Sequence, residues 1–228
     1  MALYAIGDIH GHKKPLKALI KAINPSDDDT VVFLGDYVSK GPKVKGVLNY
    51  LMKLARRDNF IFLRGNHDHL FIESFNDHHR LPELEEAFED EFLSSYEEGE
   101  IAVLMDQVPT EHIEFLTNRC QDFYETEDFI FVHGGIRKGK KPKKESPKKL
   151  YNRKLEAAKP HKSGRTVICG HTAQSSGEIA DLGHTICIDT GITKKKFLTC
   201  LKLDDFSYLQ ATKKGVIHSG QLRPQTSG

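Results

Sequence analysis

Five short motifs in this chain combine glycine with side chains that can bind metal ions or transfer protons. They are Gly7-Asp8-Ile9-His10-Gly11, Gly35-Asp36-Tyr37-Val38-Ser39-Lys40-Gly41, Gly65-Asn66-His67-Asp68, His133-Gly134-Gly135 and Gly170-His171-Thr172. Each follows a short apolar stretch, and open α/β sheets bind their ligands just beyond the carboxyl ends of strands. The glycines allow tight turns and close approach of the backbone to a ligand. One such motif alone would indicate a turn, whereas all of them together predict a functional site.

Six side chains in these motifs could bind metal ions through two carboxylates, three imidazoles and an amide oxygen. They are Asp8, His10, Asp36, Asn66, His133 and His171. Mixed oxygen and nitrogen donors favour Mn, Fe, Co or Zn, and the lack of a thiolate argues against a structural zinc site. This set is too large for one catalytic ion with an open position, but it fits two ions that share a carboxylate. Two ions about 3.5–4 Å apart can hold a hydroxide and clamp a phosphoryl group for in-line attack.

Alternating strands and helices must position these motifs. Hydrophobic periodicity predicts strands at residues 2–6, 30–34, 59–63, 129–132, 166–169, 185–188 and 197–202, and helices at residues 13–23, 44–54, 83–92 and 110–120. The βαβαβ order of the first half predicts a mostly parallel sheet with right-handed crossovers. The last strands follow one another without such helices, which predicts an antiparallel sheet there.

Length and composition bound the class of protein. The chain has 228 residues, 38% of them hydrophobic and 29% charged, with a formal net charge of +1. We expect one soluble domain over residues 1–217, a basic loop near residues 137–150 leading into a short helix, and a frayed tail over residues 218–228. No apolar run approaches the ~20 residues of a membrane span, and the first residues read as a strand rather than a secretion signal. The dispersed cysteines favour a reduced, cytoplasmic protein.

Two segments have opposite charge bias. Residues 83–100 contain nine acidic and no basic side chains, and residues 137–154 contain ten basic side chains and one acidic one. We interpret both as solvated surface. They could instead flank a site on opposite walls, and the basic segment could attract phosphorylated substrates or bind nucleic acid.

The motifs together resemble the metal-dependent phosphoprotein phosphatase superfamily, the calcineurin-like metallophosphoesterases. This superfamily includes serine/threonine phosphatases, small bacterial protein phosphatases and symmetrical diadenosine-tetraphosphatases. The resemblance extends from Tyr4 to Gly191 and includes Ile188-Asp189-Thr190-Gly191. It implies an α/β fold, a four-layer αββα sandwich of mixed sheets and flanking helices. It also implies two divalent metal ions between the sheets, manganese first, with Fe, Zn, Co or Ni as alternatives.

The resemblance also implies a role for each matching residue. The roles are Asp8 and His10 on the first ion, Asp36 as the bridge, Asn66, His133 and His171 on the second ion, His67 as the general acid, and Arg64 and Arg153 as phosphate-binding arginines, with Asn66 also near the substrate. Arg153 is chosen because Tyr151-Asn152-Arg153 is similar to a segment of the small phosphatases. The implied reaction is attack on phosphorus by a metal-bridged hydroxide. We interpret Asp68 as structural and leave Asp189 between supporting the metal ions and capping a turn.

The identity of the substrate stays open at this point. The leading prediction is hydrolysis of phosphomonoesters, of the serine/threonine phosphoprotein type. Most protein phosphatases, however, have Asp-Arg where this chain has Ser39-Lys40, and that Asp orients the general acid. Its replacement by a neutral serine favours the alternative, a hydrolase of diadenosine tetraphosphate or other nucleotide anhydrides. A third hypothesis is a non-catalytic nucleic-acid-binding protein on the same scaffold.

Overall fold

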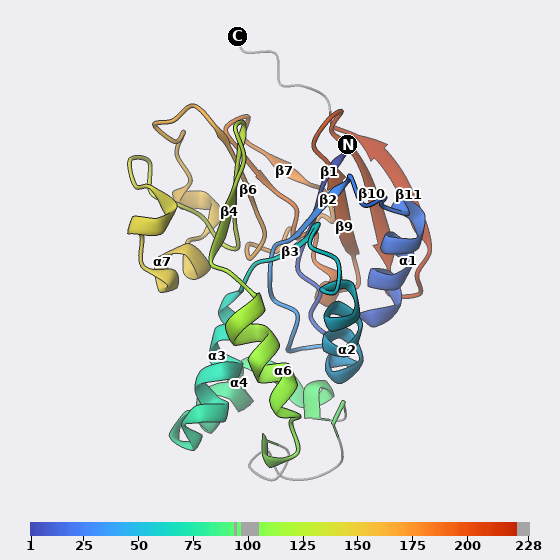
Figure 1. Cartoon of the computed structure of the whole chain (residues 1–228), viewed down its shortest axis with the longest axis vertical. Helices are drawn as coiled ribbons and strands as arrows, with labels where there is room; N and C mark the ends of the chain where they lie inside the picture. The colour runs from blue at the N-terminus through green and yellow to red at the C-terminus, as the bar shows by residue number, and fades with distance from the viewer. Residues whose placement is uncertain (94, 97–104, 223–228) are drawn as a thin grey trace.

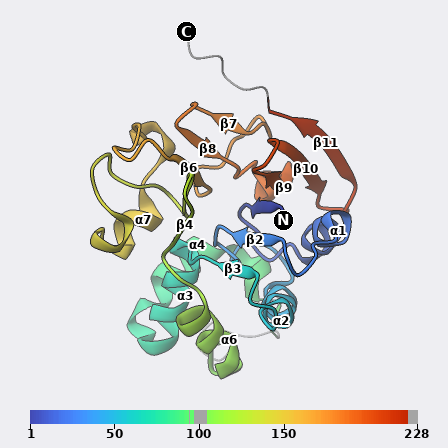
Figure 2. The same ribbon diagram turned by 45° about the horizontal axis from the view of Figure 1, so that its top comes forward.

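Two β-sheets packed face to face lie at the centre of the structure, with helices outside each of them (Figure 1). The structure is a computed structural model that describes residues 1–93, 95–96 and 105–222. Seen from above, the two sheets lie side by side, with α1 and α2 outside one and α7 outside the other (Figure 2). This is the four-layer αββα arrangement that the resemblance implied.

The first sheet has the strand order β11-β10-β9-β1-β2-β3. Its strands are β1 (Leu3–Ile6), β2 (Thr30–Phe33), β3 (Phe60–Phe62), β9 (Phe197–Lys202), β10 (Ser207–Thr212) and β11 (Ile217–Gln221). The pairs β1–β2 and β2–β3 are parallel, as the βαβαβ order predicted. The other three pairs are antiparallel.

The second sheet has the strand order β4-β5-β6-β8-β7. Its strands are β4 (Phe123–Glu125), β5 (Phe129–Val132), β6 (Thr166–Cys169), β7 (Ala180–Asp181) and β8 (Thr185–Cys187). The antiparallel prediction is wrong for its centre, because β5–β6 and β6–β8 are parallel. The chain between β5 and β6 contains α7, which makes this connection a crossover. Only the edge strands β4 and β7 pair antiparallel.

Helices cover the outer faces of both sheets and the region below the carboxyl ends of the strands (Figure 1). Their bounds are α1 (Lys13–Ile23), α2 (Val44–Leu54), α3 (Asn66–Asn76), α4 (Leu81–Leu93), α6 (Thr110–Glu114) and α7 (Pro147–Asn152). A π-helical turn over Phe115–Arg119 continues α6, so the helix predicted at residues 110–120 changes its hydrogen-bonding pattern halfway. Short 3₁₀ turns lie at His78–Arg80, Pro142–Lys144, Leu155–Ala157 and Ile192–Lys194.

Alternation along the strands separates three apolar layers, because successive side chains point to opposite faces of a sheet. On β2, Val32 packs between the sheets, while Val31 and Phe33 pack with α1 and α2. On β5, Phe131 packs between the sheets, while Ile130 packs with α7. The middle layer therefore holds the two sheets together and brings their carboxyl ends to a common edge.

The carboxyl-terminal segment differs from its prediction in part. β11 occupies Ile217–Gln221 and pairs with β10 over five residues, although we expected fraying from residue 218 onward. The polar side chains of this strand hid it, because an edge strand can expose both of its faces. Residues 223–228 lie outside the described residues. Among the helices of the described part, none combines the length and the apolar character that a bilayer span requires.

One buried histidine outside the motifs gives the fold a pH dependence. His112 on α6 is 0% exposed; the hydroxyl of Tyr96 lies 3.0 Å from its Nδ1, and its Nε2 lies 3.0 Å from Oδ1 of Asn49. Nε2–H donates to Asn49, so Nδ1 accepts from Tyr96, and a second proton would break that contact. Burial lowers the pKa of His112 to about 4; the negative charge of Glu111 opposes this shift, and the positive charge of Lys45 adds to it.

We expect His112 to make folding less favourable as the pH falls from 6.5 toward 4. The unfolded chain takes up the proton near pH 6.5, whereas the folded chain does so only near pH 4. Stability is therefore full above 6.5 and decreases by about 1.4 kcal/mol per pH unit, to a total of roughly 3 kcal/mol. Urea unfolding of wild type and His112→Gln across this range measures the effect. Parallel pH profiles of the two proteins would contradict it.

Candidate metal centre

The six predicted metal-binding side chains meet at the common edge of the two sheets. Asp8 and His10 follow β1, Asp36 follows β2, Asn66 begins α3, His133 follows β5 and His171 follows β6. Nε2 of His133 lies 3.0 Å from Oδ1 of Asn66 and 3.4 Å from Oδ2 of Asp36. Nδ1 of His171 lies 2.9 Å from the same Asn66 oxygen. One half of the donor set is thus assembled around Asn66.

Asp36 joins this half to the other. Its Oδ2 lies 3.7 Å from Nε2 of His10, which is in turn 4.0 Å from Oδ2 of Asp8. Donor atoms of Asp8, Asp36 and His133 all fall within 4.8 Å of one another. This carboxylate oxygen lies between histidines on both sides. A carboxylate that bridges two metal ions needs such a position.

Two glycines leave room for the carboxylates. A Cβ atom at Gly65 would lie 2.0 Å from Oδ1 of Asp36, and one at Gly170 would lie 2.0 Å from Oδ1 of Asp8. Gly65 has a φ of −95°, which any residue can adopt. Glycine is required here because the backbone closes directly over the predicted metal ligands.

Several residues of the centre adopt backbone conformations that usually require glycine. The φ angles are 42° at His10, 50° at Asp36, 74° at Ser39 and 65° at His171. Left-handed conformations at non-glycine residues cost about 1–3 kcal/mol each and persist only where the surrounding structure imposes them. These backbone conformations therefore lower the stability of the fold, and they direct the predicted metal-binding side chains toward one another.

The electrostatics of the centre favour positive charge. Burial would raise the pKa of Asp36, but His133, His67 and His10 hold it well below its usual range. Burial would lower the pKa of His133, but Asp36 and Asp8 raise it to about 10. Burial of Asp8, reinforced by the nearby charge of Asp189, raises its pKa well above the usual range.

The other two histidines offer unprotonated nitrogens. Burial lowers the pKa of His10 to about 3 and that of His171 to about 4. An ionised bridging carboxylate and neutral imidazoles are the forms that bind divalent ions. The residues of the centre therefore fit metal ions in donor type and in spacing, and an ion that binds there would displace the protons that the raised pKa values of His133 and Asp8 retain.

Neighbouring groups orient the histidine rings. Nδ1 of His133 lies 2.9 Å from the carbonyl oxygen of Leu34, so that Nε2 faces Asp36. Nδ1 of His10 lies 2.9 Å from the hydroxyl of Ser39 and 3.2 Å from the carbonyl oxygen of Val38. The sequence led us to expect Ser39 beside His67, but its hydroxyl contacts a predicted metal ligand instead. Hydrogen bonds of this kind to the remote ring nitrogen hold metal-binding histidines in position.

His67 lies at the edge of the donor set, in the first turn of α3. Its Nε2 is 3.9 Å from Oδ2 of Asp36, and its backbone N–H donates to Oδ1 of the same carboxylate at 3.0 Å. Its ring packs edge-on against His10 and also against Phe88 of α4. Its side chain keeps 14% of its surface exposed, so it can meet both the predicted metal ions and a substrate.

Asp68, the next residue, organises two of the motifs. Its carboxylate accepts the backbone N–H groups of Tyr37 at 2.9 Å, Val38 at 3.3 Å and Gly65 at 2.9 Å. It is fully buried and binds the second motif to the third, in agreement with its structural interpretation. Asp189 accepts the backbone N–H of Gly191 at 3.1 Å and so caps a turn.

The two predicted phosphate-binding arginines have different surroundings. The guanidinium of Arg64 donates to the carbonyl oxygens of Leu116 at 2.9 Å and of Thr117 and Cys120 at 2.8 Å. It thereby closes the carboxyl end of the π-helical turn through Nε and Nη2, while its Nη1 lies 3.4 Å from Oδ1 of Asp122. Sequence motifs do not record such contacts, because the partners are backbone groups more than fifty residues away.

Arg153 is free for a ligand. Its side chain lies over the turn that follows His133, where a Cβ atom at Gly135 would be 3.1 Å from Cδ of Arg153. Within the described ranges, no residue accepts a hydrogen bond from its guanidinium group. Lys154, which the motifs did not single out, is close enough to add to the lowering of the pKa of His171. The only sequence signal for Lys154 was its position next to Arg153, a predicted phosphate-binding residue.

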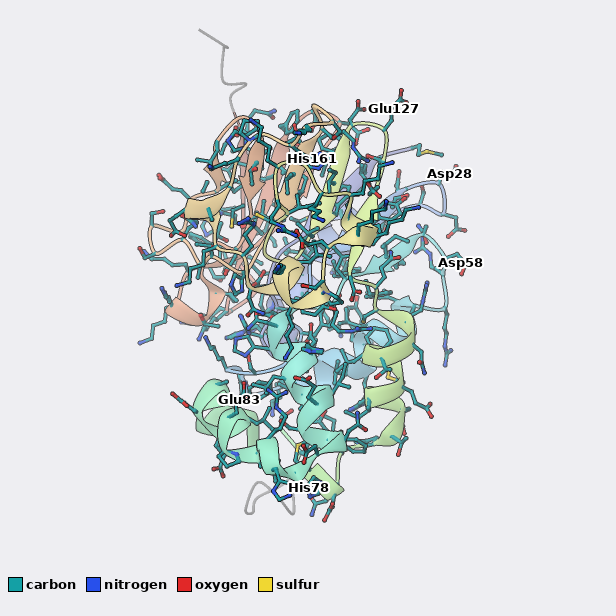
Figure 3. All side chains as sticks on the ribbon, turned by 90° about the vertical axis from the view of Figure 1, so that its left-hand side faces the viewer. Asp28, Asp58, His78, Glu83, Glu127 and His161 are labelled. Atoms are coloured by element: carbon teal, nitrogen blue, oxygen red, sulfur yellow. The ribbon has the colours of Figure 1, made fainter. Side chains whose placement is uncertain are left out.

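Other histidines lie outside the centre. His78 sits at the far end of the helical region, and His161 lies near the basic segment, where its Nε2 is 3.0 Å from the carbonyl oxygen of Lys140 (Figure 3). Nδ1 of His12 lies 3.2 Å from the carbonyl oxygen of Ile9, at the start of α1. The high histidine content therefore reflects several structural roles besides the centre.

Comparisons with known proteins agree with this geometry. A family model described as calcineurin-like phosphoesterase matches residues 1–194. A symmetrical bis(5'-nucleosyl)-tetraphosphatase of Pseudomonas fluorescens (strain SBW25) is 42% identical over 77 residues, which are 32% of this chain and 26% of that protein. A Caenorhabditis elegans protein provisionally called a serine/threonine-protein phosphatase is 40% identical over 65 residues, which are 28% of this chain and 18% of that protein.

A solved structure has the same fold. The crystal structure of a protein provisionally called a diadenosine tetraphosphatase superposes with a TM-score of 0.67 at 18% identity, covering 96% of this chain and 92% of that one. The alignments with the curated relatives span about a quarter or less of those proteins. Similarity in sequence is therefore concentrated in part of the chain, whereas similarity in fold covers nearly all of it.

Gly170→Ala is expected to weaken metal binding without unfolding the protein. The new Cβ atom would take the place of Oδ1 of Asp8 and turn this carboxylate away from the other donors. We expect at least a tenfold weaker affinity for manganese, about 1.4 kcal/mol, measured by titration calorimetry. Gly139→Ala is the matched control, because its Cβ atom would meet only the flexible side chain of Lys162. Equal manganese affinity in Gly170→Ala and wild type would refute the crowding argument.

Proposed function

Because the chain belongs to the calcineurin-like phosphoesterase family, we propose that its donor set holds two divalent metal ions and that the protein is a metal-dependent phosphohydrolase. The observation that carries this proposal is the position of Asp36, whose Oδ2 lies 3.7 Å from His10 on one side and 3.4 Å from His133 on the other. Loss of any other donor would weaken the binding of one ion, whereas loss of Asp36 would remove the shared ligand of both ions.

The proposed ions divide the donors between them. Asp8, His10 and Asp36 would hold one ion, and Asp36, Asn66, His133 and His171 the other. We propose manganese first, and Fe, Zn, Co or Ni suit the same mixture of oxygen and nitrogen donors. When bound, the ions act as Lewis acids on the phosphoryl oxygens and lower the pKa of bound water.

Two side chains complete the proposed machinery. Arg153, whose side chain lies over the turn after His133 and whose guanidinium has no acceptor among the described residues, can bind phosphoryl oxygens through two parallel hydrogen bonds. His67, at the exposed edge of the donor set, can pass a proton from its ring to the departing oxygen. The catalytic assignment of Asp36, Arg153 and His67 follows from these positions. We place Arg64 second as a phosphate ligand, because backbone carbonyls accept hydrogen bonds from its Nε and Nη2 and leave Nη1 for a substrate.

For the substrate, we place nucleotide anhydrides such as diadenosine tetraphosphate first. A curated relative from Pseudomonas fluorescens that matches about a third of this chain is named a symmetrical tetraphosphatase, which supports this choice. Ser39 supports it as well, since it stands where most protein phosphatases have the aspartate that orients the general acid, and its hydroxyl contacts His10 instead. An anhydride expels a phosphate whose conjugate acid has a pKa of about 6, so it depends less on a general acid than an alkyl ester does.

Phosphoprotein remains the second candidate. Tyr151-Asn152-Arg153 is similar to a segment of the small protein phosphatases, and the side chain of Arg153 lies over the turn that follows His133. The non-catalytic hypothesis has less support, because the six predicted donors lie together at the common edge of the two sheets. The cysteines are free and buried, in agreement with our proposal of a reducing, cytoplasmic environment.

A substrate panel with manganese tests the activity. We expect diadenosine tetraphosphate to be hydrolysed with a higher kcat/KM than a phosphoserine peptide, and p-nitrophenyl phosphate to be turned over as well. Asp36→Asn should reduce all three to background, because it disconnects the two halves of the donor set. A faster reaction with the peptide would favour the second candidate, and inertness toward all three substrates would refute a phosphohydrolase.

Substitutions of the two arginines are expected to affect different properties, catalysis for Arg153 and stability for Arg64. Arg153→Gln should lower kcat/KM by on the order of 10²-fold with little change in stability, because only the substrate contact is lost. Arg64→Gln should instead destabilise the fold by about 2 kcal/mol, because it leaves three carbonyl oxygens without their donor. Thermal unfolding and p-nitrophenyl phosphate kinetics of both variants separate the roles. If Arg64→Gln reduced kcat/KM as strongly as Arg153→Gln at unchanged stability, the original assignment of Arg64 would be correct.

A further inference from the structure

A basic hollow opens on the α7 side of the molecule, the side that faces the reader in Figure 3. It has a volume of about 470 Å³. Its lining comes from α7 and the chain around it: Arg137, Lys148, Lys149, Asn152, Arg153, Lys154 and Ala157. We call this concavity the α7 hollow. Five of its seven lining residues are cationic, the other two being Asn152 and Ala157.

Most of these cations lack an acidic partner. Arg137 is bound to Glu145, with Nε 2.6 Å from Oε2 and Nη2 2.9 Å from Oε1. In the described part of the chain, no carboxylate lies within ion-pair distance of the four others. Like charges gathered around one concavity repel one another and attract an anion from solution. The α7 hollow is therefore suited to a ligand with several negative charges.

The α7 hollow adjoins the turn that follows His133, one of the predicted metal donors, because the side chain of Arg153 lies over that turn. Arg153 and Lys154 also line a narrower hollow that includes Gly134 and Gly135, which directly follow His133. Two cations of the α7 hollow act on histidines near the centre. Lys154 adds to the burial that lowers the pKa of His171, and Lys148 does so at His69. A chain of phosphates with its reacting end at the centre could thus lie along this basic surface.

We propose that the α7 hollow is a second phosphate-binding subsite, which holds the distal phosphate groups of a phosphate-chain substrate while the metal centre acts on one phosphorus. This inference rests on the proposed function and specifies which part of the substrate the α7 surface recognises. A single phosphoserine would leave the α7 hollow empty, whereas a phosphate chain brings about one negative charge per phosphate into it. Single-stranded nucleic acid fits less well, because the lining has no aromatic side chain on which bases could stack.

Paired lysine substitutions test the subsite. Lys148→Gln/Lys149→Gln removes two charges from the lining of the α7 hollow. Lys143→Gln/Lys144→Gln is the matched control, because it removes two equally exposed charges from the same basic segment outside the lining. Binding is measured by calorimetry with the manganese-loaded full chain. The probes are orthophosphate and the bis-methylene analogue of inorganic triphosphate, which is not hydrolysed.

The expected result is a selective loss. Lys148→Gln/Lys149→Gln should bind the triphosphate analogue about tenfold more weakly than wild type, with a much smaller effect on orthophosphate, and the difference should diminish at high salt. The control should bind both probes as wild type does. For hydrolysis, the loss in kcat/KM should be about tenfold larger for diadenosine tetraphosphate than for p-nitrophenyl phosphate.

Other outcomes would overturn the proposal. Equal weakening in both lysine pairs would mean that only overall charge matters. An effect on a single-stranded RNA homopolymer but none on the triphosphate analogue would identify a nucleic-acid surface instead. Absence of any turnover together with selective weakening of the analogue would refute the proposed function while leaving the subsite intact, so the two failures can be told apart.

Discussion

Two buried carboxylates at the junction of the sheets constrain the rest of the structure. Asp8 and Asp36 are 3% and 2% exposed, and within the described residues only histidines lie within ion-pair distance of them. Ionised groups at such positions are costly by several kcal/mol unless cations accompany them. The glycines beneath the carboxylates, the left-handed ligand residues and the hydrogen bonds to the remote ring nitrogens all serve to keep this negative charge where a metal ion can meet it.

The sandwich is the means by which this charge is concentrated. Neither sheet alone contains the complete donor set, since Asp8, His10 and Asp36 follow strands of the first sheet and His133 and His171 follow strands of the second. The apolar layer between the sheets fixes their separation and thereby the spacing of the donors. Surrounding basic residues on α7 then offer the opposite charge to a substrate. Metal binding and substrate attraction thus occupy adjacent regions of opposite sign.

Most of the predicted site residues could be identified from the sequence, but fewer of the contacts around them could. Helices α1 and α2 were predicted with their observed bounds, because their apolar residues recur at helical spacing. The six donors could be identified because each belongs to a local motif. The contact of Ser39 with His10 and the closure of a helix end by Arg64 could not, since both depend on groups distant in the chain. The parallel pairing of β5 with β6 was missed because α7 lies within a segment read mainly by its charge.

The backbone N–H of His171 donates to both oxygens of Asp8, a residue 163 positions earlier in the chain. A contact of such long range cannot form while the protein is being synthesised until most of the chain has left the ribosome. Until then, the carboxylate of Asp8 lacks its hydrogen-bond donor from the carboxyl-terminal half. Contacts between residues distant in sequence are also slow to form during folding. A metal ion with donors from both sheets would then bind only at the last stage of folding, and it would link the two halves of the folded chain.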